Sequence, residues 1–216
     1  MNLIRIEGIR FYPDEIRDLL IAWAALGAAF SVFIFVATGR DVFPDITGAV
    51  FSPMFARVFV VSALTVGIGF LLHELAHKVV AVRFGQVASF KADYKMLALC
   101  IGAAFAGFLF AAPGAVYHRG RITERQNGLV SVAGPLTNIG LVAAFLPLAF
   151  FEGFLGQVGQ LGVLVNAFLA AFNMIPFGPL DGKSVISWSK PVFGAVFVGS
   201  VLLSIAAFLF VGFPSF

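Results

Sequence analysis

The chain has 216 residues, of which 60 % are apolar and only 12 % are charged, and its mean hydropathy is +1.00. A soluble domain is about half apolar and about a quarter charged, so this composition excludes a soluble globular protein and indicates an integral membrane protein that forms one compact helical bundle. The net charge of +3 does not indicate a nucleic-acid partner, because the basic residues lie between apolar runs, where membrane topology explains them. The single cysteine, Cys100, excludes an intramolecular disulfide and a cysteine-rich metal site.

Five stretches of the chain are apolar for long enough to cross a membrane, which takes about 20 helical residues for a hydrocarbon core of roughly 30 Å. The arm that precedes them carries both signs of charge as far as Asp18, and the apolar run after it is longer than the hydrophobic segment of a signal peptide. We therefore expect the first span to be retained. In chain order the spans are Leu19 to Gly39, Val58 to Val82, Leu129 to Phe151, Phe154 to Ile175 and Pro191 to Gly212.

A sixth apolar stretch, Met96 to Val116, decides the topology. If it crosses the membrane, six lysines and arginines lie on one side and seven on the other. If it enters and returns around A-A-P-G, eleven of the thirteen that lie outside the spans share one side and only Arg40 and Arg57 lie opposite. The second arrangement fits the excess of positive residues on the cytoplasmic side of membranes.

We therefore predict an all-α polytopic membrane protein with five to six transmembrane helices and a re-entrant or β-hairpin segment near residues 97–117. Whether Leu97 to Phe108 is a helix of its own stays open. Non-helical backbone at membrane depth must pack inside protein or line a wet cavity, so Phe110 to Tyr117 should border an interior cavity.

The second span carries the sequence H-E-L-A-H at residues 73–77. Residues four apart project from one face of a helix, so His73 and His77 can bind one metal ion between their imidazoles. Glu74 can then reach a metal-bound water without being a ligand. The alternative is that both histidines are interior polar residues bonded to the backbone or to each other. An ionisable residue is costly inside a membrane span, which favours the metal site, and the ligand type favours zinc.

Two histidines leave a catalytic zinc one protein ligand short. Asp181 follows N-M-I-P-F-G-P-L, a polar and proline-broken interruption between two spans, and the charge distribution puts it on the same side as the histidines. We therefore predict Asp181 as the third ligand. The other acidic candidates lie at span ends, in basic loops or on the poorly basic side: Asp18, Glu152, Asp93, Glu124, Asp41 and Asp45.

Three motifs occur in a characteristic order: H-E-L-A-H at His73 to His77, A-G-P-L-T-N at Ala133 to Asn138, and N-M-I-P-F-G-P-L-D-G at Asn173 to Gly182. Together they resemble the site-2 protease family of intramembrane zinc metalloproteases. The resemblance covers about Phe59 to Trp188. It implies a single integral membrane metalloprotease domain over residues 1–216 with its core at about 58–188, one zinc ion on His73, His77 and Asp181, and Glu74 as the general base.

The resemblance also implies roles for residues outside the metal site. Asn138 would contact the substrate backbone or the developing oxyanion, and Asn173 would help to shape the cleft; the alternatives are a helix-packing amide and a simple turn residue. Independently of the resemblance, the A-A-P-G-A-V segment leads us to expect that an extended substrate segment adds to a strand edge there, which would make Ala112, Pro113 and Gly114 substrate-binding residues.

The expected partners are the lipid bilayer and a membrane-protein substrate with a transmembrane helix, cleaved on the cytoplasmic side of a prokaryotic cell membrane. The sequence does not indicate an oligomeric state. Two other function classes stay open: a metal or proton transporter that uses the His, Glu and Asp cluster, and a catalytically silent membrane scaffold. A transporter would more often show inverted repeats, and a silent homologue would be expected to lack Glu74 or a ligand; neither holds for this sequence.

Overall fold

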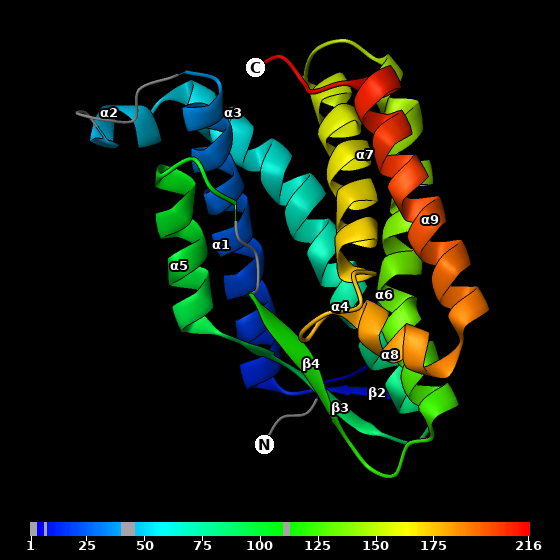
Figure 1. Ribbon diagram of the computed structural model, residues 1–216. Coiled ribbons are helices and arrows are strands. Elements are labelled where there is room, and N and C mark those ends of the chain that lie inside the picture. The colour runs from blue at the N-terminus through cyan, green and yellow to red at the C-terminus, as the bar shows by residue number, and fades with distance from the viewer. Residues whose placement is uncertain (1–3, 7, 40–45, 110–112) are drawn as a thin grey trace.

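The computed structural model describes residues 4–6, 8–39, 46–109 and 113–216. Long helices form one bundle, and two small two-stranded sheets lie at the end of the bundle near the amino terminus (Figure 1). The elements are β1 (Ile4–Ile6), β2 (Ile9–Phe11), α1 (Pro13–Ala37), α2 (Ile46–Val50), α3 (Pro53–Ser62), the π-helical turn η1 (Ala63–Gly67), α4 (Ile68–Arg83), β3 (Val87–Ala92), α5 (Tyr94–Phe105), β4 (Gly114–Arg119), α6 (Glu124–Phe145), the 3₁₀ turn η2 (Leu146–Phe150), α7 (Gly153–Asn173), α8 (Asp181–Trp188), α9 (Lys190–Ala206) and the π-helical turn η3 (Ala207–Val211).

Within the described residues, five helical segments are long and apolar enough to cross a membrane, which confirms the predicted multi-pass architecture. The first three begin several residues before the apolar pattern indicated, because polar residues that start the helices extend them. Pro13, Asp14 and Glu15 form the first turn of α1, and Thr123 caps α6 by accepting a hydrogen bond from Gln126 N. The segments are Pro13–Ala37, Pro53–Arg83, Glu124–Phe150, Gly153–Asn173 and Lys190–Val211.

The second span is interrupted by the π-helical turn η1. Trp23 of α1 lies against this turn and donates its indole N–H to the carbonyl of Ala63 at 2.9 Å. A Cβ at Gly67 would collide with the same indole, so the glycine allows α1 and the second span to approach closely. The π-turn precedes His73 by about one and a half helical turns.

The sixth apolar stretch enters the bundle and returns. Helix α5 has 12 residues, a length of about 18 Å, which is too short for the hydrocarbon core of roughly 30 Å. After α5 the chain comes back to β4, which pairs antiparallel with β3, so both ends of the segment lie at the same end of the bundle (Figure 1). The re-entrant hairpin is confirmed, and the crossing alternative is wrong.

The core lies where α1, the second span, α5 and α7 pack together. Its buried side chains include Leu26, Val58, Phe70, Cys100 and Leu161. By contrast, only 11 % of the most apolar part of the last span, Lys190–Val211, is buried, against 61 % for α7. The last span therefore presents most of its apolar surface to lipid.

Candidate metal and catalytic site

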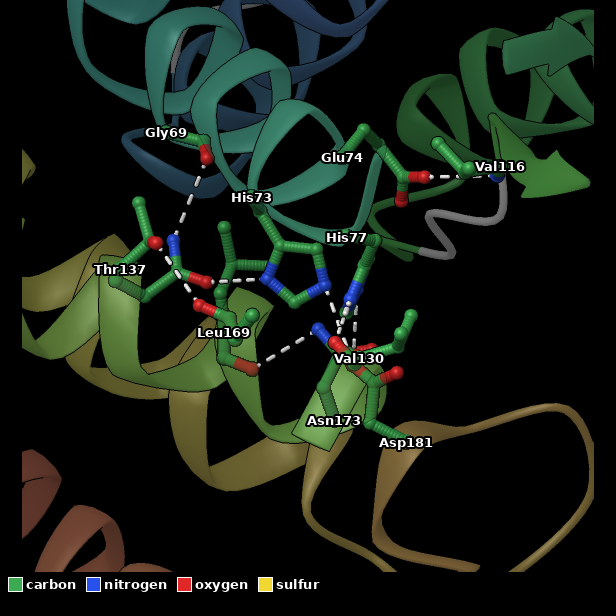
Figure 2. A network of polar contacts seen from close by, with 12 residues as sticks. Gly69, His73, Glu74, His77, Val116, Val130, Thr137, Leu169, Asn173 and Asp181 are labelled. Carbon is green, nitrogen blue, oxygen red and sulfur yellow. Dashed lines mark hydrogen bonds and ion pairs between the residues drawn. The ribbon is translucent and has the colours of Figure 1, made fainter. Parts of the chain in front are cut away.

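Three side chains meet where α4 and α8 both pack against α6. His73 and His77 project from one face of α4, and Asp181 is the first residue of α8. Nε2 of His73 lies 3.3 Å and Nε2 of His77 lies 3.4 Å from Oδ2 of Asp181. All three of these ligand atoms lie within 4.8 Å of one another. Figure 2 shows the two imidazoles and the carboxylate converging on one point.

The spacing of these donors fits a tetrahedral zinc ion. Zinc binds imidazole nitrogen and carboxylate oxygen at about 2.0–2.2 Å, so two tetrahedral ligands lie about 3.3 Å apart. The two nitrogen-to-oxygen distances of 3.3 Å and 3.4 Å match this value. Oδ2 of Asp181 is also buried and lacks a hydrogen-bond partner in the described part of the chain, as expected of an oxygen reserved for a cation.

Asp181 is ionised at neutral pH, as a metal ligand must be. Burial by itself would raise the pKa of this carboxyl. The positive charge that His77 and His73 carry when they are protonated outweighs burial and lowers the pKa of Asp181 to about 2.

Both histidines are held with Nε2 toward the metal position. Nδ1 of His77 lies 2.8 Å from the carbonyl oxygen of Val130, and Nδ1 of His73 lies 2.6 Å from Oδ1 of Asn138. Both partners are acceptors, so each Nδ1 carries the proton and each Nε2 keeps its lone pair for the metal. Partners of this kind fix the tautomer and ring orientation of metal-binding histidines.

A chain of amides fixes the orientation of Asn138 in turn. Its Nδ2 donates to Oδ1 of Asn166 on α7 at 2.8 Å, and Nδ2 of Asn166 donates to the carbonyl of Gly162 at 2.8 Å. A backbone carbonyl can only accept, so the Gly162 carbonyl fixes which group donates and which accepts in each hydrogen bond from Asn166 through Asn138 to His73. Asn138 and Asn166 are fully buried.

This position bears on the role that the resemblance implies for Asn138. Its oxygen faces His73, its nitrogen faces Asn166, and it is absent from the described residues that line the site cavity. The geometry therefore suits a residue that orients a metal ligand. Direct contact with a substrate stays a prediction.

Two glycines allow the helices to approach this closely. A Cβ at Gly134 of α6 would lie 2.6 Å from ring atoms of both His73 and His77. A Cβ at Gly182 would collide with the backbone of Met174, so this glycine lets the start of α8 fold back against the end of α7 and present Asp181. Both glycines belong to the motifs A-G-P-L-T-N and P-L-D-G.

Glu74 lies beside the two histidines and points toward β4. It is 8 % exposed, and its Oε2 accepts a hydrogen bond from the backbone N–H of Val116 at 3.0 Å (Figure 2). One carboxylate oxygen is thereby fixed by the strand. The other is left without a hydrogen bond to any residue that the structure describes.

The metal-binding residues and Glu74 open into a cavity of about 430 Å³. Pro113, Gly114 and Asn173 lie in its wall, whereas Ala112 falls outside the described residues. Asn173 donates its amide N–H to the carbonyl of Leu169 at 3.0 Å. The cavity therefore borders the re-entrant hairpin, as expected for backbone at membrane depth, and substrate contacts of these residues stay predictions.

Comparison with known proteins places this site in a family. The chain is 38 % identical over 193 residues to a protein of Methanocaldococcus jannaschii, an overlap that covers 87 % of this chain and 91 % of that protein. The chain belongs to the same zinc metalloprotease family. This relative is named "Putative zinc metalloprotease MJ0611". A protein of Bacillus subtilis with the same description, YwhC, is 33 % identical over 146 residues, which cover 57 % of this chain and 66 % of that protein.

No family model and no solved structure gives a significant match. The zinc cofactor predicted from the ligand type agrees with the names of the zinc metalloprotease relatives and with the His73, His77 and Asp181 group.

Sequence reasoning missed several residues that support this zinc metalloprotease site. Asn166 is an amide within an apolar span, a rare placement that by itself points to a buried polar contact. Gly134 and the carbonyl of Val130 act through distances between helices, which no sequence spacing shows.

Proposed function

We propose that the protein is an intramembrane zinc metalloprotease of the site-2 protease type, which hydrolyses a peptide bond in or near a transmembrane segment of a membrane-protein substrate. One observation carries this proposal: Glu74 and the metal-binding group share a cavity with the β4 strand, inside a bundle of membrane-spanning helices. A proton acceptor, a metal site and a surface that can align a peptide are the parts that peptide hydrolysis needs.

The chemistry follows from the positions of the side chains. Zinc held by His73, His77 and Asp181 would polarise the scissile carbonyl and activate a water. Glu74 accepts the proton of the attacking water and later gives it to the leaving amine, which is the role of a general base and then a general acid. The hydrogen bond from Val116 fixes one oxygen of Glu74 and leaves the other available for these transfers.

The β4 strand would align the substrate. Within the described residues β4 pairs with β3 alone, so its other edge can take an extended peptide. A transmembrane substrate helix would first have to unwind, because its carbonyls are bonded within the helix. The N–H of Val116 already donates to Glu74, so it cannot donate to a peptide that pairs with the β4 residues on either side of Val116. The peptide carbonyl that faces Val116 would therefore lack a hydrogen bond and would lie next to Glu74. We propose this carbonyl as the one attacked.

The site would face the cytoplasmic side of the cell membrane. Eleven of the thirteen lysines and arginines outside the spans share one side when the hairpin returns, and positive residues are retained on the cytoplasmic side. The end of the bundle that carries the sheet and α8 would then be the cytoplasmic end, with a polar entry route for water past Asn173.

The decisive experiment combines metal analysis with cleavage. Protein purified in detergent is analysed for zinc and incubated with a substrate that has one transmembrane helix, as wild type, as Glu74→Gln and as the control Glu152→Gln, whose residue is exposed in the loop before α7. We expect one zinc per chain in all three and cleavage by wild type and the control, with Glu74→Gln slower by at least about a hundredfold.

Each other outcome has a clear meaning. Undiminished cleavage by Glu74→Gln would exclude this mechanism, and wild type without zinc would exclude the metal site. Zinc-loaded wild type that cleaves no substrate would favour a transporter or a silent scaffold. Photo-reactive residues in the substrate give a separate test of the strand contact: absence of adducts at residues 110–117 would argue against docking on β4.

A further inference from the structure

Two carboxylates at the start of α1 accept hydrogen bonds from the outer edge of β3. Oε1 of Glu15 accepts from the backbone N–H of Phe90 at 3.0 Å, and Oδ2 of Asp18 accepts from that of Ala92 at 3.1 Å. Glu15 and Asp18 are three residues apart and so lie on one face of the helix. Phe90 and Ala92 are two residues apart on the strand, so their N–H groups point to the same edge. The carboxylates take the hydrogen bonds that a third strand would take.

A buried lysine next to a metal ligand neutralises one of these carboxylates. Nζ of Lys78, which follows His77, donates to Oε1 of Glu15 at 2.5 Å and to the carbonyl of Arg10 at 2.8 Å. It also lies 4.0 Å from the centre of the Phe11 ring. Glu15 is 2 % exposed and Lys78 is 1 % exposed, and charges this deeply buried are stable only when they are paired. The same ion pair therefore joins α1 to the helix that carries the histidines.

The contact made by Glu15 lies opposite the contact made by Glu74. Phe90 and Val116 are direct partners in the antiparallel register. The N–H of Phe90 points outward to Glu15, and the N–H of Val116 points outward on the other edge to Glu74. A movement of the sheet away from α1 would therefore move Val116 relative to Glu74.

We propose that Glu15 and Asp18 are positioning residues, which hold the β3–β4 sheet in the place where Val116 contacts Glu74, with Lys78 as the counter-ion of Glu15. Glu15 and Asp18 lie in the first span, outside the region that carries the three sequence motifs. The consequence for cleavage rests on the proposed protease function, whereas the contact between the sheet and Glu74 does not.

Asp18 gives the cleaner test, because substitution of Glu15 would also leave Lys78 buried without its partner. Asp18→Ala removes the acceptor of the Ala92 N–H and also that of the Tyr94 hydroxyl, whereas Asp18→Asn keeps an acceptor oxygen at the same position. Asp14→Ala removes a neighbouring but exposed carboxylate and is the matched control. Each variant is purified in detergent, its zinc content is measured, and hydrogen exchange is followed at the amides of Ala92 and Val116.

We expect exchange at both amides to be about tenfold faster in Asp18→Ala than in wild type, because the sheet loses the hydrogen bond from the Ala92 amide to a charged group. Zinc content should stay at the wild-type level, and Asp18→Asn and Asp14→Ala should exchange as wild type does. The decisive amide is Val116, because it lies on the far strand and bonds to Glu74. Faster exchange at Ala92 with Val116 unchanged would overturn the proposal.

If Asp18→Ala does not fold, Ala92→Pro breaks the same contact from the strand, since proline has no N–H and an outward-facing edge position tolerates it. Faster exchange at Val116 in that variant supports the proposal, and unchanged exchange overturns it.

Cleavage is measured in parallel. Asp18→Ala should reduce cleavage of the single-helix substrate while zinc stays bound, and Asp18→Asn should restore it. If wild type itself cleaves nothing, the protease function fails while the exchange measurement still decides the positioning role.

Discussion

Glu15 and Glu74 accept hydrogen bonds from opposite edges of one cross-strand pair, Phe90 and Val116. The first carboxylate belongs to the first span and the second to the helix that carries the histidines. A sheet of two strands therefore separates a structural glutamate from the proposed catalytic base. The position of the base depends on contacts made on the far side of that sheet.

Gly134→Ala should weaken zinc binding. The added methyl group would lie 2.6 Å from ring atoms of both histidines, so the imidazoles must turn away from Asp181. We expect the zinc affinity to fall by about 10- to 100-fold, the loss typical when metal-binding histidines lose their orientation. Competition with a zinc-binding dye measures this. Gly140→Ala on the same helix meets open space and is the control, which should bind zinc as wild type does.

Asn166→Ala should also reduce the zinc affinity, although the residue touches no ligand. Without the Asn166 oxygen, Asn138 keeps only the longer hydrogen bond to the carbonyl of Gly69, at 3.4 Å, to orient its amide. It can then turn its nitrogen toward His73 more readily. We expect a loss of up to about tenfold, at the low end of effects for residues around metal sites. Ser200→Ala is the control, because this buried hydroxyl bonds within α9 to Phe197. Equal zinc affinities for the two variants would show that the amide chain has no effect on the metal.

Lys78→Met should destabilise the fold more than the double variant Lys78→Met with Glu15→Gln. The single substitution leaves the buried carboxylate of Glu15 without its cation, which typically costs about 3–5 kcal/mol. The double variant removes both charges, and glutamine keeps an acceptor for Phe90. Unfolding in detergent followed by circular dichroism measures both. A double variant no more stable than the single one would contradict this account of the pair.

Labelling of single cysteines should show that the α5 segment returns. In a Cys100→Ala background, cysteines at Lys91 and Arg121 should react with an impermeant reagent from the same side of the membrane, because they lie on either side of the hairpin. A cysteine at Arg57 should react from the opposite side. All three positions are exposed, and the native Cys100 is buried. Reaction of Lys91 and Arg121 from different sides would contradict the re-entrant arrangement.

The sequence predicted those parts of the site that depend on local spacing and on charge. The spacing of His73 and His77 fixes a shared helix face, and the distribution of lysines and arginines was enough to infer the return of the hairpin and the side of Asp181. The hydrogen bond between Asn138 and His73 could not be predicted in the same way, because it depends on how closely α4 approaches α6. Lys78 and Glu15 are 63 residues apart, and no pattern in the sequence pairs them.

The ion pair between Lys78 and Glu15 also limits how small a working form of the protein can be. Residues 58–188 include the metal-binding group and the proposed base. A chain cut to this region would nevertheless bury the Lys78 cation with neither the Glu15 carboxylate nor the Arg10 carbonyl beside it. The helix would then have to twist until that charge reached water, one residue away from a metal ligand. The first span therefore belongs to the smallest unit that can fold around the metal, although it carries none of the recognisable motifs.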